Sequence, residues 1–271
     1  MSSENRIPSD TRLFSFWFAA GLLVALILLA AATVAIPELL SPGHLLSVAL
    51  EAGVIDSITV TFAAGFVAVL ILVFLGTPLA YLLARGKSRW NGLIETVVDL
   101  PLALPHTVAG LMIYLLFMMR GPLGMPFFQV GIVFEEAFAG IVAAMVFVST
   151  PYYVDAVREG IAQVPERLEF VARTLGASRF RAVQTITLPM SMRSIISGAF
   201  LAWGRAIGEF AAVVMIAYFP MVVSTLIYHR FTTGGLAESR SIAFIMLVAC
   251  LLVFLIFRLV SHGWGGRHDR T

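Results

Sequence analysis

The chain contains little cysteine, little lysine and little charge of either sign. Cys250 is the single cysteine among 271 residues, so neither an intrachain disulfide nor a cysteine-based zinc site can form. Asp, Glu, Lys and Arg make up 13% of the residues, about half of the roughly 25% found in soluble domains. Hydrophobic residues make up 59%. These proportions exclude a soluble enzyme, whose surface needs more charge, and they also exclude a disordered chain.

Six long apolar segments remain when charged residues are taken as boundaries. A bilayer core about 30 Å thick needs about 20 apolar residues per helix. The segments therefore predict an all-α integral membrane protein with six transmembrane helices in a single transmembrane domain, residues 1–271. They cover residues 13–37, 57–84, 100–119, 137–154, 194–218 and 241–260. The fifth is the least regular, because Arg205 and Glu209 interrupt it.

The basic residues predict how these segments are oriented. Fourteen Lys and Arg residues lie in the N-terminal tail, the loop after the second segment, the loop at 155–193 and the C-terminal end from Arg258 onward, whereas the opposite side has three. Those three are Arg120, Arg230 and Arg240. Cytoplasmic loops carry the excess of basic residues, so we expect both termini in the cytoplasm. The net charge of +2 gives no reason to expect a nucleic-acid partner.

The cytoplasmic loop at 155–193 is expected to contain a short amphipathic helix. Pro165 suits its first position and Gly176 suits the residue just past its end. Glu169 and Arg173 are spaced for an ion pair on one face. The opposite face is apolar and carries Leu168, Val171, Ala172 and Leu175. Physical reasoning alone leaves two places open for this helix, the lipid surface and a groove on a soluble partner.

Several residues of this loop keep a characteristic spacing: Ala172, Gly176, Ile186, Leu188 and Pro189. The spacing resembles the signature loop of importer-type ABC transporter permeases, which reads Glu-Ala-Ala, three residues, Gly, nine residues, Ile, one residue, Leu-Pro. Phe170 and Val171 stand where that pattern has Glu-Ala. Three further stretches look like the molybdate, tungstate and sulfate permeases of this group: 99–110, 172–176 and 208–212.

The resemblance implies a type I ABC importer permease that carries a tetrahedral oxyanion, most often molybdate or tungstate, across a prokaryotic plasma membrane. It implies a homodimer embedded in the lipid bilayer, with two ATPase subunits and an extracytoplasmic oxyanion-binding protein as partners. It also implies that the loop holds a coupling helix, which docks on the ATPase. The residues expected to couple are Leu168, Glu169, Val171, Ala172, Arg173, Leu175, Gly176, Ile186, Leu188 and Pro189.

No phosphate-binding loop is recognisable in the chain. The tripeptide Gly86-Lys87-Ser88 resembles the last three residues of a Walker motif. However, Tyr81 occupies the position of the first glycine of that motif, and Lys87 is the only lysine in the chain. We therefore expect ATP and Mg²⁺ to be bound by a separate subunit, with no cofactor, catalytic residue or metal in this chain.

Two polar features lie inside the apolar segments. Arg205 and Glu209 are one helical turn apart, and either charge alone would cost roughly 2.5–3.5 kcal/mol at the middle of a membrane. Pro105, followed by His106 and Thr107, interrupts the third segment. Each feature has two interpretations, internal packing or a translocation path or gate, because broken helices are common at transport sites.

Other functions fit the sequence less well. An ion-coupled secondary transporter usually has inverted repeats and buried carboxylates in both halves, whereas only Glu209 lies clearly within a segment. A membrane-embedded enzyme needs a cluster of reactive groups, and His106 and Glu209 are too isolated to form one. Within the permeases, a sulfate or thiosulfate permease is the alternative.

Overall fold

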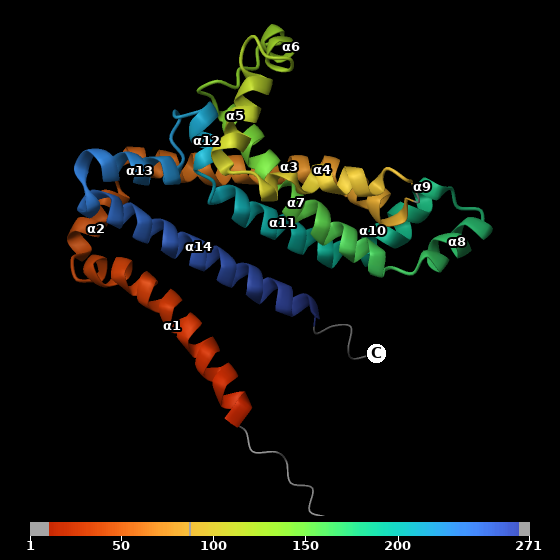
Figure 1. Ribbon diagram of the computed structural model, residues 1–271, viewed down its shortest axis with the longest axis horizontal. Helices are drawn as coiled ribbons and strands as arrows, with labels where there is room; N and C mark the ends of the chain where they lie inside the picture. The colour runs from red at the N-terminus through yellow and green to blue at the C-terminus, as the bar shows by residue number, and fades with distance from the viewer. Residues whose placement is uncertain (1–10, 87, 266–271) are drawn as a thin grey trace, which may run out of the picture. The chain divides into compact units, whose positions relative to one another are not determined.

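The computed structural model describes residues 11–86 and 88–265, and every regular element in these ranges is a helix. The helices of the first half are α1 (Thr11–Leu39), α2 (Pro42–Ala49), α3 (Ala52–Arg85), α4 (Asn91–Ala103), α5 (His106–Phe117), α6 (Gly124–Gln129) and α7 (Phe138–Gln163). Those of the second half are α8 (Glu166–Thr174), α9 (Arg179–Ala182), the π-helix η1 (Val183–Thr187), α10 (Leu188–Met190), α11 (Met192–Ile207), α12 (Ala211–Ile216), α13 (Val223–Gly234) and α14 (Leu236–Gly265). Figure 1 labels most of them.

Four helices are long and apolar enough to cross a membrane. They are α1, α3, α7 and α14, and they cover the first, second, fourth and sixth predicted segments. A fifth crossing is possible if the bent pair α4 and α5 counts as one span. The Lys87 of the Walker-like tripeptide lies outside the described residues, whereas Tyr81 belongs to α3, as expected for a helical position.

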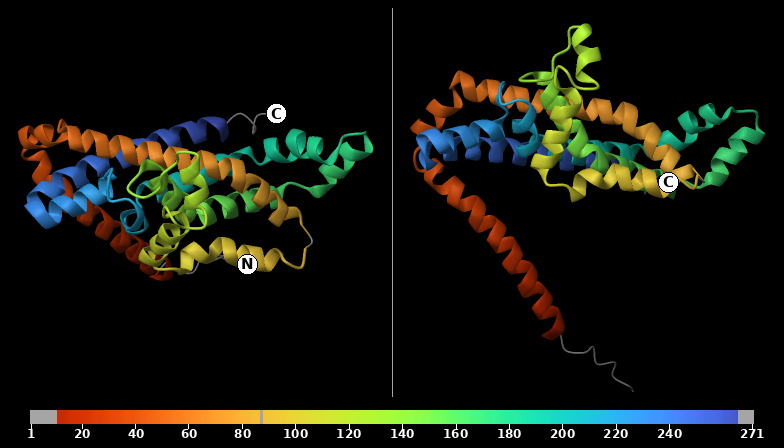
Figure 2. Two further views of the ribbon diagram at one scale, coloured as in Figure 1. Left: turned by 90° about the horizontal axis from the view of Figure 1, so that it is seen from above. Right: turned by 45° about the horizontal axis from the view of Figure 1, so that its top comes forward.

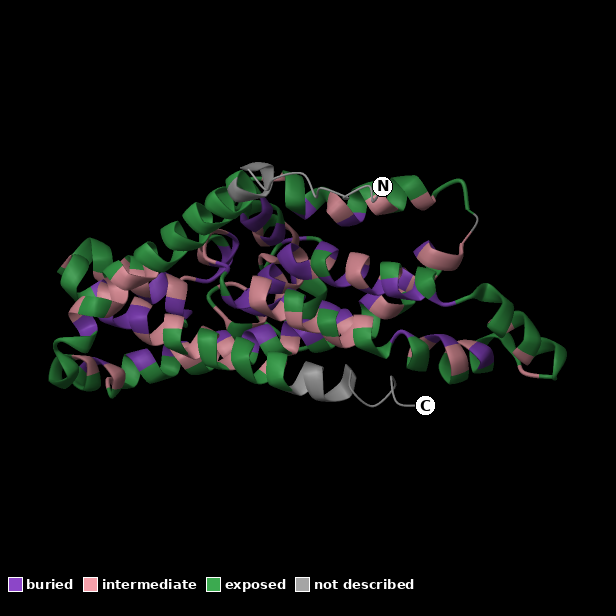
Figure 3. Cartoon of the chain, turned by 90° about the horizontal axis from the view of Figure 1, so that it is seen from below, coloured by how far each residue is buried: buried purple, intermediate pink, exposed green. Residues whose placement is uncertain are grey.

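The described helices form two compact units. The larger one contains residues 55–228, and its central helix is α7, which packs along α11 and against α4, α5 and α12. Buried residues gather where these helices meet (Figure 3). Tyr153 of α7 is fully buried and its hydroxyl lies 2.6 Å from the Thr77 hydroxyl of α3, so the aromatic ring has a polar partner inside the core.

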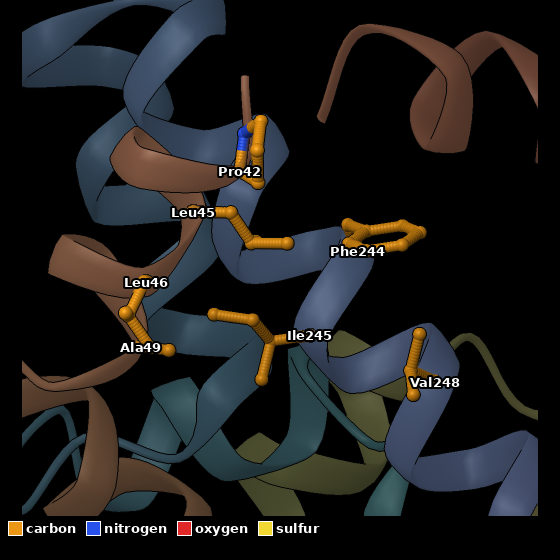
Figure 4. A pocket seen from close by; sticks show the side chains of 7 residues that line it. All are labelled: Pro42, Leu45, Leu46, Ala49, Phe244, Ile245 and Val248. Atoms are coloured by element: carbon orange, nitrogen blue, oxygen red, sulfur yellow. The ribbon is translucent and has the colours of Figure 1, made fainter. Parts of the chain in front are cut away.

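The smaller unit contains residues 11–54 and 229–265. Helices α1 and α14 pack on each other, yet little of either span is buried, so their apolar faces are available to lipid. At the end of α1, Glu38 is 1% exposed and accepts hydrogen bonds from Arg240 Nε and Ser241 Oγ, each at 2.7 Å. Beside this cluster, α2 and α14 line a shallow apolar groove with residues such as Leu45 and Ile245 (Figure 4).

Two of the predicted segments are broken helices. The third segment is divided at 104–105, where α4 and α5 meet at 115°, a far sharper change than a proline kink (Figure 2). The prediction of a continuous helix over 194–218 is wrong, because α11 ends at Ile207 and α12 begins only at Ala211. Both breaks lie in the larger unit, and α5 packs directly on α12 beyond them.

Gly110 is what allows α5 and α12 to approach so closely. A Cβ atom at this position would lie 2.8 Å from the Cα and carbonyl oxygen of Ala212 and 2.8 Å from the Cβ of Met215. Two of these atoms are backbone, which cannot move aside without shifting α12. Gly110 is therefore a packing glycine in which the absence of a side chain is required.

Substituting Gly110 should separate the two half-helices. We expect Gly110→Ala to destabilise the folded permease by about 1–3 kcal/mol, as overpacking does. The measure is the fraction that elutes as a single species in detergent after graded heating. Gly92→Ala is the matched control, because a Cβ at Gly92 of α4 meets no atom within 4 Å. Equal thermal losses in the two variants would contradict this account of the α5–α12 contact.

Candidate functional site

The two helix breaks place three polar side chains together. Pro105 is the N-cap of α5, so His106 and Thr107 occupy the first two positions of that helix. Arg205 lies in the last turn of α11, and Glu209 lies between α11 and α12. The predicted path residues thus come from the ends of two different broken helices, 99 positions apart between His106 and Arg205.

Arg205 bridges Glu209 and His106. Its Nη2 atom donates to Glu209 Oε2 at 2.6 Å and lies 3.1 and 3.2 Å from the Nε2 and Nδ1 atoms of His106. The imidazole Nδ1 is 3.9 Å from the same carboxylate oxygen. We call Arg205, Glu209 and His106 the break cluster. With a neutral imidazole its formal charges cancel, so each buried charge has a compensating partner.

Glu209 also organises the second break. Its other oxygen, Oε1, accepts a hydrogen bond from the Ala212 N–H at 2.7 Å, which satisfies one of the free donors at the start of α12. Its own backbone carbonyl accepts from Ser224 Oγ at 2.8 Å. The side chain is 2% exposed. The continuous helix expected from hydropathy is replaced because the carboxylate competes for that backbone donor.

The partners of this buried carboxylate are more exposed than the carboxylate itself. The side chain of Arg205 is 17% exposed and that of His106 is 48% exposed, while Pro105 and Thr107 are exposed beside them. Thr107 makes no side-chain hydrogen bond to another described residue. The arrangement therefore offers one fixed guanidinium and one accessible imidazole at a surface lined by helix ends.

The predicted amphipathic helix in the loop at 155–193 is α8, which follows the end of α7 (Figure 1). Pro165 is the N-cap of α8, whereas the sequence predicted it at the first helical position, so the helix begins one residue later than expected. Its end is as predicted: Gly176 has a φ of 93°, and the N–H groups of Gly176 and Ala177 donate to the carbonyls of Arg173 and Ala172. These two bonds form a Schellman motif, which a glycine in the left-handed region permits.

The apolar face of α8 is available to a partner. Leu168, Val171 and Leu175 are 37%, 46% and 83% exposed, and Ala172 is half-buried. Phe170, which replaces the glutamate of the family pattern, is also exposed, at 57%. Arg173 is exposed as well. Such an exposed apolar stripe on a short helix suits docking into a groove of another protein.

Glu169 does not form the predicted ion pair with Arg173. Its Oε1 atom accepts from Arg85 Nε at 3.1 Å and from Thr187 Oγ1 at 2.7 Å, and its Oε2 accepts from the Tyr81 hydroxyl at 3.0 Å. The prediction considered only neighbours on the same helix, whereas three donors from other elements compete successfully for this carboxylate. The charged side chain thus points into the protein and does not lie on the apolar stripe of Leu168, Val171 and Leu175.

These hydrogen bonds determine the ionisation of Glu169. Burial by itself would raise the pKa of the carboxyl group, but hydrogen bonds from Thr187, Tyr81 and Arg85, together with the charge of Arg85, hold the pKa below its usual value. The carboxylate therefore stays charged at neutral pH. Its stabilising contribution is present above the ordinary pKa of a glutamate and is lost as the pH falls through the lowered pKa.

The remainder of the loop at 155–193 leads back to α11. Ser178 caps α9 through a hydrogen bond from the Arg181 N–H at 3.2 Å. The π-helix η1 then brings Thr187 to a fully buried position, and Pro189 sits in the first turn of α10 without breaking the path of the chain. Ile186 and Leu188 are half-buried and Pro189 is exposed.

Sequence reasoning missed Arg85, Tyr81 and Thr187 as functional candidates. Arg85 is the last residue of α3, and its side chain is 6% exposed. It was interpreted only as one of the basic residues that orient the chain. No local pattern connects Arg85 with Glu169, which is 84 positions away.

Comparison with known proteins identifies the family. The model for binding-protein-dependent transport system inner membrane components matches residues 76–266, well over half of the chain. The chain belongs to this family. It is accordingly a multi-pass cell-membrane protein and a permease component of an ABC importer, as the signature loop predicted.

Relatives of this permease include permeases named for the transport of molybdate and tungstate or of sulfate. It is 40% identical over 205 residues to the molybdate/tungstate transport system permease protein WtpB of Thermococcus kodakarensis, which covers 76% of this chain and 78% of that one. With the WtpB of Methanocaldococcus jannaschii the identity is 37%, over 81% of this chain and 86% of the relative. The sulfate transport system permease protein CysT of Salmonella typhimurium is more distant, at 32% over 79% of each.

A solved structure supports the same fold. A bacterial ABC transporter that imports the acidic polysaccharide alginate matches with a TM-score of 0.68 over 96% of this chain and 97% of the other. The sequence identity is 18%, so this likeness concerns the fold alone. The all-α ABC importer permease architecture predicted from the sequence is confirmed at that level.

The end of α8 provides a direct test of the helix geometry. Replacing Gly176 by valine should cost about 1–2 kcal/mol or more, because a β-branched residue disfavours the left-handed conformation. We expect Gly176→Val to insert normally but to retain less of the ATPase subunit on co-purification. Gly176→Asn should be milder, because asparagine tolerates positive φ. Full retention of the ATPase by the valine variant would show that the Schellman end is not needed for docking.

Proposed function

We propose that this permease carries a tetrahedral oxyanion, molybdate or tungstate, into the cytoplasm as the membrane subunit of an ABC importer. The observation that supports the cargo is the 37–40% identity, over most of both chains, to permeases named for molybdate and tungstate. The relatives named for sulfate are less similar. A sulfate or thiosulfate permease is the alternative, since these anions share the same tetrahedral shape and charge.

The proposed topology has six spans with both termini in the cytoplasm. In it, α4 with α5 forms the third span and α11 with α12 forms the fifth, and both units belong to one permease domain. The working assembly would be two permeases, two ATPase subunits and an extracytoplasmic binding protein. ATP and Mg²⁺ would act on the ATPase subunits alone, so this chain would be a transport subunit rather than an enzyme.

In this proposal α8 is the coupling helix. Its exposed Leu168, Val171 and Leu175 would fill a groove on the ATPase subunit. An apolar stripe on a short helix suits such a groove. Gly176 would end the helix where the chain turns back. Ile186, Leu188 and Pro189 would support α8 from the returning segment rather than contact the ATPase.

The break cluster would line the translocation path. Arg205 attracts an oxyanion, and Glu209 balances that attraction, so an anion is held only briefly. Weak binding favours transport, because a site that binds tightly also releases slowly. The accessible His106, with Pro105 and Thr107 at the start of α5, would line the passage beside Arg205.

The path role of Arg205 can be separated from a packing role. Arg205→Lys keeps a positive charge beside Glu209 but loses the planar group that contacts Glu209 and His106 together. We expect normal yield and a fall in ATP-driven oxyanion uptake of roughly tenfold, the effect of losing about one hydrogen bond to a charged group. Uptake is measured in proteoliposomes with the ATPase and binding protein present.

Matched variants decide between the two roles. Arg120→Lys, at an exposed position, is the control and should leave uptake unchanged. Arg205→Ala leaves the buried carboxylate of Glu209 without its ion-pair partner and should lower the yield of folded permease. Arg205→Ala combined with Glu209→Ala should recover that yield without recovering uptake. Recovery of uptake in the double variant would show that the pair serves packing only.

A further inference from the structure

Glu169 occupies an unusual place for a residue of a docking helix. The neighbouring Phe170 and Val171 are 57% and 46% exposed, whereas the side chain of Glu169 is 12% exposed and directed into the protein. A carboxylate that contacted the ATPase would need to be on the outer face. Glu169 therefore serves contacts within this chain.

Those contacts join four separate elements at one ion pair. Arg85 and Tyr81 come from the last turns of α3, and Thr187 comes from η1. The Nη2 atom of Arg85 also donates to the carbonyl of Val164, which is the C-cap of α7, at 2.5 Å. A single guanidinium–carboxylate pair thus connects the cytoplasmic ends of α3 and α7 with the start of α8.

The pair is buried on both sides, and this makes separation unfavourable. The side chain of Arg85 is 6% exposed and that of Glu169 is 12% exposed. Pulling them apart would leave two charges with little access to water, which costs far more than breaking an exposed ion pair. Glu166, by contrast, lies 4.0 Å from Arg85 and is 48% exposed, so its contribution is small.

We propose that Arg85 and Glu169 form the joint through which a displacement of α8 moves the cytoplasmic end of α3. The proposal rests on the coupling function proposed above and names the residues that transmit it. The two residues position helices and do not contact cargo or ATP. Since the pair stays intact, α8 and the end of α3 move as one body, and the exposed face of α8 is left free to hold the ATPase.

The proposal predicts uncoupling without loss of docking. We expect Glu169→Gln to keep the ATPase subunit on co-purification and to keep ATP hydrolysis, while the oxyanion taken up per ATP falls by about tenfold, as loss of a charge-assisted hydrogen bond allows. Arg85→Gln should act in the same way. The double variant should be no worse than either single variant, because the two residues act through each other.

Two controls make the result specific. Glu166→Gln removes a charge from the same helical turn at an exposed site and should leave uptake per ATP unchanged. Leu175→Asp alters the exposed apolar face and should remove the ATPase from the complex. If Leu175→Asp retained the ATPase, the proposed docking of α8 would be wrong. If Glu169→Gln retained normal uptake per ATP, the joint would be wrong while the docking proposal stands.

A distance measurement tests the joint itself. Spin labels on cysteines at Leu82 of α3 and Thr174 of α8, both exposed, report the separation of the two helices after Cys250→Ala removes the native thiol. With ATP added to the complete importer, the intra-subunit distance should stay constant in the parent and change in Glu169→Gln. A change of equal size in both proteins would overturn the joint, as would loss of the ATPase from Glu169→Gln.

Discussion

The carboxylate of Glu209 is 2% exposed, in a chain whose long apolar helices are suited to a lipid bilayer. One of its oxygens accepts from Arg205 and the other from the Ala212 N–H, so the same side chain neutralises a cation and begins a helix. A buried, unpaired carboxylate would be strongly destabilising. The end of α11, the start of α12 and the placement of Arg205 beside His106 all depend on this one residue.

The larger unit has a second polar pair with the same physical character, where α3 ends and α8 begins. Arg85 and Glu169 are also buried, and they join α3, α7, α8 and η1, as Arg205 and Glu209 join the ends of α11 and α12. The same unit has an apolar core made by α3, α4, α7 and α11. Packed helices of this kind transmit displacement because their interiors are dense and shift as rigid bodies. The permease thus concentrates its few interior charges where chain segments must be held together.

Hydropathy and charge patterns predicted α1, α3, α7 and α14 well, because a long apolar helix in lipid satisfies its own backbone. The glycine at 176 and the apolar stripe of α8 also followed from local sequence. The break at 208–210 did not, because it depends on which backbone donor the Glu209 carboxylate captures. The partner of Glu169 was likewise assigned wrongly. Arg85 is distant in sequence, and only the packing of α3 against the loop brings the two together.

The central claim is that this chain transports molybdate or tungstate and that ATP hydrolysis on a separate subunit drives the transport. The most direct measurement is uptake of isotope-labelled tungstate into proteoliposomes that contain the permease and its ATPase, with the binding protein outside and ATP inside. The account predicts uptake that requires both ATP and the binding protein, is suppressed by unlabelled molybdate and is little affected by the same concentration of sulfate. Uptake driven by an ion gradient without ATP, or suppressed by sulfate but not by molybdate, would contradict it.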